Sequence, residues 1–225
     1  MTSSKRAAVQ TEFGFVRWGG KRRGAGRKPK GERAGVSHAK RPKLCQRFPV
    51  HVTVRLRRGL PSLRCKEAYL VLKRAFAAGA MRFRFRLVEY SVQTDHLHFI
   101  AESTDGRALS RGMLGLSVRI ARALNALWGR RGRVLDDRYH VRILRTPREV
   151  RNALVYVIQN ARKHGAWHAE RPDPFSSGPW FGGWKGRAQV SISRSGFLDR
   201  ARTWLLGIGW QRHGLIQFHE IPATS

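Results

Sequence analysis

The sequence predicts an α+β fold with a ferredoxin-like (RRM-like) antiparallel sheet, helices on one face of the sheet, and a further C-terminal helix. Four segments alternate apolar with polar residues, as half-buried strands do. Three other segments repeat apolar residues at helical spacing. Their order along the chain is β-α-β-β-α-β-α, and the first six elements match the split βαβ arrangement. RNA-binding modules share this fold, so the fold alone decides nothing about function.

The first four elements are predicted from patterning between residues 50 and 102. Residues 50–56 alternate valine or leucine with polar residues, which indicates a half-buried strand. Residues 63–78 carry apolar residues at helical spacing after a proline turn. Residues 82–93 alternate arginine with phenylalanine or leucine and predict one strand. Thr94-Asp95 supplies a turn, and residues 96–102 return as the second strand of a hairpin.

The last three elements begin with a long helix predicted over residues 107–128. Residues 137–144 form a further strand candidate. The final helix has Thr146 as N-cap and Glu149 closing a capping box, and it is predicted to end at Gly165. The apolar stripe of the long helix consists of Leu109, Met113, Leu116, Ile120, Leu124 and Leu127.

Charge is the most unusual feature of the composition. The 225 residues include 45 Lys and Arg against 14 Asp and Glu, a formal net charge of +31. Such an excess favours a polyanion partner, nucleic acid first, with a ribosome-associated protein or a membrane-surface binder as alternatives. Cys45 and Cys65 fit no metal or disulfide spacing, and no apolar run has the length of a membrane span. We therefore expect a cytoplasmic, nucleoid-associated protein.

Three regions are predicted: a flexible basic arm (1–44), a folded domain (45–165) and a Trp/Gly/Pro-rich C-terminal extension (166–225). The arm is expected to track phosphates. A short helix is expected at residues 197–206 of the extension. The aromatic residues of the extension suit either base stacking or packing against the domain, and we favour packing because an exposed tryptophan is costly.

Four residues carry the predicted chemistry. His96 and His98 lie two apart on a strand, so their rings share one face and form a pair of candidate metal ligands. Tyr156 lies on the predicted polar face of the last helix rather than among its valines. Asn160 is one turn further on, which suits a nucleophile beside a third metal ligand. His51 faces the polar side of the first strand and is a candidate neighbour of the metal.

His-x-His on a strand, followed about sixty residues later by Tyr-x-x-x-Asn on a helix, resembles the HUH single-tyrosine transposases, and REP-associated tyrosine transposases in particular. The resemblance covers residues 49–165 and includes Leu135-Asp136-Asp137-Arg138-Tyr139-His140 and Tyr156-Val157-Ile158-Gln159-Asn160. Many relatives have Asn-His-Val-His where this chain has Asp95-His96-Leu97-His98, and Pro where it has Ala161. Neither departure touches a residue with a predicted role.

The resemblance implies metal-dependent cleavage of single-stranded DNA, in which Tyr156 becomes linked to the 5′ end. His96, His98 and Asn160 would hold Mg²⁺ or Mn²⁺. The substrate would be a palindromic repeat folded as a hairpin, and the chain would act as a monomer or a homodimer in DNA transposition, without a membrane partner. The candidate DNA-binding residues are Arg22, Arg23, Arg27, Lys28, Arg111, Arg119, Arg122, Arg130, Arg131, Arg133, Arg138 and Lys163.

Three alternatives stay open from the sequence. A silent or domesticated relative would bind hairpin DNA or RNA without cutting it. An RNA-binding or ribosomal module on the same fold would bind in the presence of EDTA, although the RNP aromatic signature is absent from the sequence. A structural zinc site is the third alternative, but four convergent ligands are not visible.

Overall fold

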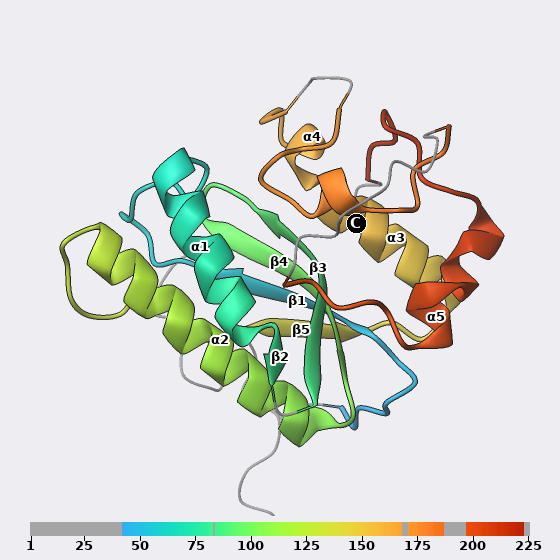
Figure 1. The fold of residues 1–225 in the computed structure, drawn as a ribbon, viewed down its shortest axis with the longest axis horizontal. Helices are drawn as coiled ribbons and strands as arrows, with labels where there is room; N and C mark the ends of the chain where they lie inside the picture. The colour runs from blue at the N-terminus through green and yellow to red at the C-terminus, as the bar shows by residue number, and fades with distance from the viewer. Residues whose placement is uncertain (1–41, 83, 168–170, 187–196, 223–225) are drawn as a thin grey trace, which may run out of the picture. The chain divides into compact units, whose positions relative to one another are not determined.

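A five-stranded antiparallel sheet, in the order β2-β3-β4-β1-β5, forms the centre of the fold. The computed structural model describes residues 42–82, 84–167, 171–186 and 197–222 (Figure 1). Residues 1–41, with most of the predicted basic arm, lie outside the described residues. The strands are β1 (Val50–Arg55), β2 (Met81–Arg82), β3 (Phe85–Val92), β4 (His96–Ser103) and β5 (His140–Ile143).

Two helices cover one face of the sheet, and a third packs on the other. The helices are α1 (Lys66–Gly79), α2 (Gly106–Leu127), α3 (Pro147–Ile158), α4 (Asn160–Lys163) and α5 (Trp204–Gly207), with 3-10 turns η1 (Gly178–Trp180) and η2 (Gly209–His213). Helices α1 and α2 lie side by side (Figure 1) and share a core with β1, β3 and β4. Helix α3 packs on β3 and β4 through a second core. The predicted α+β class is confirmed.

Apolar and polar residues alternate along β1, so the strand contributes side chains to both faces of the sheet. Val50, Val52 and Val54 are buried under α1 and α2. His51 and Thr53 therefore face the α3 side, because successive side chains of a strand point to opposite faces. The polar half of the first strand is thus placed beside α3.

The single strand predicted over residues 82–93 is wrong in its first part. Met81 pairs with Arg86 and Arg82 with Phe85, so this segment folds back as the short hairpin β2-β3. Arg84 has a φ of 59°, the left-handed backbone that a two-residue hairpin turn requires. The regular alternation continued through the turn and hid it. A register shift between Leu87 and Glu89 further breaks the alternation within β3.

The final helix begins as predicted but does not continue to Gly165 as one element. Thr146 and Glu149 form both halves of the capping box. Helix α3 ends at Ile158, where Gln159 leaves helical geometry with φ −108° and ψ 10°, and α4 begins at Asn160. The Gln159 amide donates to the carbonyls of Gln217 and Phe218, at 3.1 Å and 2.7 Å. A contact with the C-terminal extension therefore holds the break.

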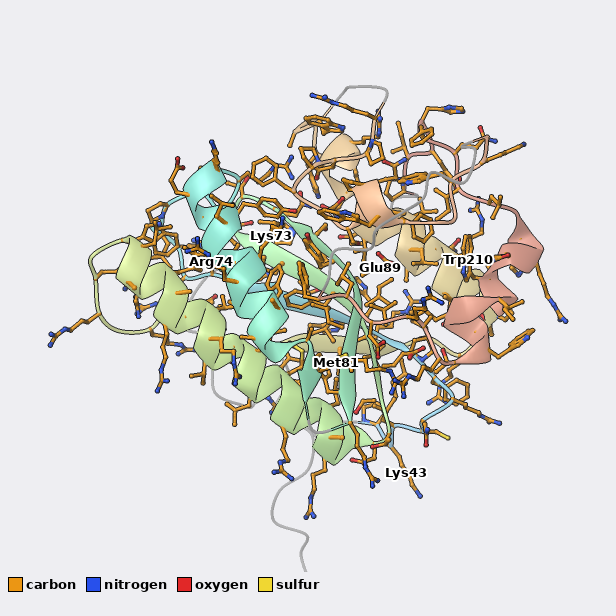
Figure 2. All side chains as sticks on the ribbon, in the orientation of Figure 1. Lys43, Lys73, Arg74, Met81, Glu89 and Trp210 are labelled. Atoms are coloured by element: carbon orange, nitrogen blue, oxygen red, sulfur yellow. The ribbon has the colours of Figure 1, made fainter. Side chains whose placement is uncertain are left out.

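The C-terminal extension packs against α3, as favoured above. Trp184 is buried and stacks on Phe218 with 4.7 Å between ring centroids. Trp210, buried in η2 beside α3, is labelled in Figure 2. The helix predicted over 197–206 is limited to α5, because the preceding residues are held in extended form: the buried Glu102 carboxylate accepts hydrogen bonds from the backbone N–H groups of Arg202 and Thr203.

None of the helices in the described residues combines the length and the apolar character that crossing a membrane would require.

Candidate active site

The paired histidines of β4 lie on the α3 side of the sheet. The ring centroids of His96 and His98 are 4.8 Å apart, so the predicted pairing of the two imidazoles is present. Burial lowers the pKa of His98 well below its usual value, and the neighbouring His51 and His96 lower it further. Burial also lowers the pKa of His96, against the opposing effect of Asp95. Both rings are therefore neutral near pH 7 and can offer a nitrogen lone pair.

One nitrogen of each ring is already occupied by a protein partner. His96 Nδ1 lies 2.6 Å from the Asp95 carboxylate. His98 Nδ1 lies 3.1 Å from both His51 Nε2 and Thr53 Oγ1. When Nδ1 carries the proton and donates to one of these partners, Nε2 keeps its lone pair. Metal-binding histidines are commonly oriented in this way by a partner on the other nitrogen.

The free nitrogen of His98 is buried. Its Nε2 atom has no hydrogen-bond partner among the residues that the structure describes. A buried polar atom without a partner costs free energy, so native structures seldom retain one without a function. This atom is one of three at the site with the same property.

Asn160 supplies the other two unpartnered atoms. Its side chain is fully buried, and within the described residues neither the amide nitrogen nor the amide oxygen makes a hydrogen bond. Asn160 follows Tyr156, which contacts His98, and precedes His164, whose ring centroid is 6.4 Å from that of His96. Of the residues on the predicted polar face, Gln159 and Asn160 are buried, because the break after α3 and the extension cover them.

Tyr156 lies against the histidines. Its ring centroid is 5.1 Å from that of His98 and 5.6 Å from that of His51, with edge-on geometry in both pairs. The Lys163 ammonium lies over the Tyr156 ring at 5.2 Å from the centroid. Tyr156 is only partly buried, so its phenol is accessible beside the buried polar atoms.

These residues fit a divalent cation. Two neutral imidazoles and an amide oxygen form a mixed nitrogen and oxygen donor set, and the atoms left unpartnered at His98 and Asn160 are donors of this kind. Three or more His, Cys, Asp or Glu side chains do not gather in a metal-binding group anywhere in the described residues. The donor set therefore depends on the asparagine, and it does not resemble a structural zinc site, which usually has four Cys or His ligands.

His51 is more central than the sequence indicated. Besides contacting His98, it has its pKa lowered to about 4 by burial, with a further effect of His140 and Arg142. Neutral His51 can accept the His98 Nδ1–H bond. The sequence indicated only that His51 occupies a polar position of an alternating strand. Its partner depends on the pairing of β1 with β4, which brings Thr53 opposite His98.

The predicted DNA-binding residues lie in several places. Arg111, Arg119 and Arg122 belong to α2, which covers the face of the sheet opposite His96 and His98. Lys163 is the one among the described candidates that contacts Tyr156. Arg130 donates to the Asn125 side chain of α2, and Arg133 donates to the Leu135 carbonyl of its own loop. Arg131 is exposed in that loop, and Arg138 precedes β5. Arg22, Arg23, Arg27 and Lys28 lie outside the described residues.

The fold and site define an α+β chain with two neutral histidines, a buried asparagine and a tyrosine gathered beside one sheet face. No family model matches the chain, and no curated protein matches it. Several solved structures are similar, including the following two. A REP-associated tyrosine transposase bound to a REP hairpin is 21% identical, with a TM-score of 0.49 over 63% of this chain and 82% of that one. A protein from Deinococcus radiodurans R1 described as a transposase is 17% identical, with a TM-score of 0.36 over 48% and 85%.

Proposed function

We propose that this chain is a metal-dependent, single-tyrosine DNA strand transferase of the HUH type, similar to REP-associated tyrosine transposases. One observation carries the proposal: the His98 Nε2 atom and the Asn160 amide are buried without partners in the described residues, and the partly exposed Tyr156 contacts His98 and lies four residues before Asn160. An RNA-binding module of the same fold has no use for these unpartnered groups.

The proposed substrate is single-stranded DNA folded as a hairpin at a palindromic repeat. The net charge of +31 supports a nucleic-acid partner, because cations that neutralise phosphates release counterions. The hairpin itself comes from the resemblance of the His-x-His and Tyr-x-x-x-Asn motifs. In this proposal residues 45–165 form the catalytic domain, and residues 1–44 add phosphate contacts.

The reaction is a transesterification at phosphorus. The Tyr156 phenolic oxygen forms a bond to phosphorus as the bond from phosphorus to the 3′ oxygen breaks. The phenol loses a proton and the departing 3′ oxygen gains one, so charge and atoms balance. The phosphotyrosine retains the ester bond, and a 3′-hydroxyl can therefore reverse the step without ATP.

His96, His98 and Asn160 would hold the Mg²⁺ or Mn²⁺ ion. When bound, such an ion polarises the scissile phosphate and orients it for attack. His51 and Thr53 hold the His98 ring through Nδ1, and Asp95 holds His96 in the same way. These contacts keep the remaining nitrogens available as ligands.

The test is covalent capture of the substrate. We would incubate the full chain with labelled single-stranded hairpin DNA taken from repeats flanking its gene, with Mn²⁺ or with EDTA, and separate the products on denaturing gels. The expected result is a protein–DNA adduct that requires the metal and disappears in Tyr156→Phe. Tyr139→Phe is the matched control, because Tyr139 is a second partly buried tyrosine outside the site, and it should retain the adduct.

A native-gel titration of the same hairpin and of its RNA counterpart, with Mn²⁺ or with EDTA, separates the rival functions. Tight hairpin binding without an adduct in Mn²⁺ would indicate a silent hairpin-binding regulator. Binding that prefers RNA and persists in EDTA would instead indicate an RNA-binding module. Either result would remove the enzymatic proposal.

A further inference from the structure

Among the described residues, no helix packs mainly on the half of the sheet face beside the candidate site. Helix α3 packs mainly on β3 and β4, whereas β1 and β5 form the remaining half of the same sheet face. In agreement with this, Arg55, His140 and Arg142 are exposed. The side chain of Arg142 retains 62% of its accessible surface. A molecule that reaches the histidines across the sheet would therefore pass over β5 and β1.

The register of the strands places three basic side chains on this half of the face. Arg55 lies directly opposite His96, in the pairing of β1 with β4. On the other edge of β1, Thr53 lies opposite His140 and His51 lies opposite Arg142. Directly opposed residues of an antiparallel pair project to the same face, so Arg55, His140 and Arg142 all share the face of the paired histidines. We call these three residues the β5 strip.

The two guanidinium groups of the β5 strip have few partners in the protein. Within the described residues, Arg55 makes no hydrogen bond or ion pair. Arg142 makes one long ion pair, 3.4 Å from Glu149. Exposed pairs of this kind contribute little, so both guanidinium groups are available to an anion.

At the outer edge of β5 the strip meets a hollow that extends around this edge to the start of α2, on the other face of the sheet. This hollow has a volume of about 1050 Å³, and both His140 and Arg142 line it. Three further cations line it: Lys43, Arg107 and Arg145. Asp105 is the single acidic residue among the described residues of its wall, and its carboxylate is engaged by the N–H groups of Arg107 and Ala108 at the start of α2.

We propose that the β5 strip and this hollow form the path by which one strand of single-stranded DNA enters the candidate site, with Arg55 contacting the phosphate nearest His96. The inference rests on the proposed function, since it assigns the path to that same site. The residues of the path are cations and an imidazole rather than aromatic rings on which bases stack. We therefore expect it to bind the phosphate backbone without preference for base sequence. None of its residues belongs to the DNA-binding set predicted from the sequence.

The test compares two double variants that lose the same charge. Arg55→Gln/Arg142→Gln removes two cations of the path. Lys66→Gln/Arg74→Gln removes two exposed cations of α1, on the opposite face of the sheet, where Figure 2 labels Arg74. We would titrate each full-length variant into fluorescein-labelled oligothymidylate in EDTA, follow anisotropy, and repeat the titration over a range of KCl concentrations.

The path variant should bind the single strand about tenfold more weakly at low salt, because charge-assisted contacts to phosphate are lost. Each lost phosphate contact should also reduce the slope of log affinity against log salt by about 0.7. The α1 variant should keep the wild-type slope. Equal slopes in the two variants would overturn the path, as would an equal loss of affinity for a blunt duplex of the same length.

Adduct formation by the wild-type chain separates this inference from the proposed function. An adduct together with equal salt slopes would leave the transferase standing and remove the path. A reduced slope in the path variant without any adduct would remove the transferase and leave the path as a single-strand binding surface.

Discussion

Replacing Asn160 with alanine should have opposite consequences with and without metal. The Asn160 amide is fully buried, and its two polar atoms have no hydrogen-bond partner in the described part of the chain. In the metal-free protein the substitution removes two desolvated groups that are not compensated. With metal present, the same substitution removes a proposed ligand. Few residues of an ordinary core behave in this way.

The magnitudes follow from the burial. An unsatisfied buried polar group costs about 1–3 kcal/mol, so its removal favours the folded state by a similar amount. The smaller side chain leaves a cavity that costs about 1 kcal/mol. In EDTA, Asn160→Ala should therefore be as stable as the wild type or more stable by about 1 kcal/mol. Metal at about a hundred times its Kd should stabilise the wild type by about 2.7 kcal/mol.

Gln159→Ala is the matched control, because it removes the neighbouring buried amide. Gln159 donates to the carbonyls of Gln217 and Phe218, so its loss leaves two acceptors without a donor. The control should lose about 1–3 kcal/mol of unfolding free energy with or without metal. Its metal increment should fall less than that of Asn160→Ala, because Gln159 holds the break before Asn160 but is not itself a proposed ligand. The measurement is urea unfolding followed by circular dichroism, in EDTA and in excess Mn²⁺.

The result that refutes this reasoning is specific. If Asn160→Ala loses as much stability in EDTA as Gln159→Ala, and gains as much from Mn²⁺ as the wild type, then Asn160 is an ordinary structural amide. The metal site would then need a different third ligand. A wild type that gains nothing from Mn²⁺ or Mg²⁺ would refute metal binding itself.

Three further perturbations test the surroundings of the site. The pKa of His51 falls from 6.5 to about 4 on folding, so below pH 6.5 the unfolded chain binds more protons. The His51 contribution to the unfolding free energy in EDTA should fall by about 3 kcal/mol between pH 6.5 and 4, in addition to the contributions of His96 and His98. His51→Gln should reduce this pH dependence by that amount in urea titrations, and an unchanged dependence would exclude the buried neutral His51. Thr53→Val removes one of the two partners of His98 Nδ1 and should weaken Mn²⁺ binding about tenfold by calorimetry, while an unchanged affinity would exclude this orienting contact. Glu102→Ala removes the buried partner of Arg86, which keeps a longer ion pair with Asp199, and leaves two N–H groups of the extension without an acceptor. It should cost about 2–4 kcal/mol in thermal melts, and a loss below about 1 kcal/mol would show that the extension is not anchored there.

Local patterns predicted most of the elements because each signal lies within the element itself. The alternation of residues 50–56 and the capping box at Thr146 each require only neighbouring residues, and both are present in the structure. The β2-β3 hairpin was missed because its turn at Arg84 carries no glycine or asparagine to mark the left-handed backbone. The end of α3 was missed because its cause, the contact of Gln159 with residues 217 and 218, is distant in sequence.

Alternation along β4 was enough to predict that His96 and His98 share a face, and helical spacing was enough to separate Tyr156 from the valines of its helix. Three features could not be predicted from these patterns: the contact of His51 with His98, the burial of Asn160 without partners among the described residues, and the position of Arg55 opposite His96. Side-chain direction within an element follows from local backbone geometry. Strand register and burial depend instead on contacts between segments that are far apart along the chain.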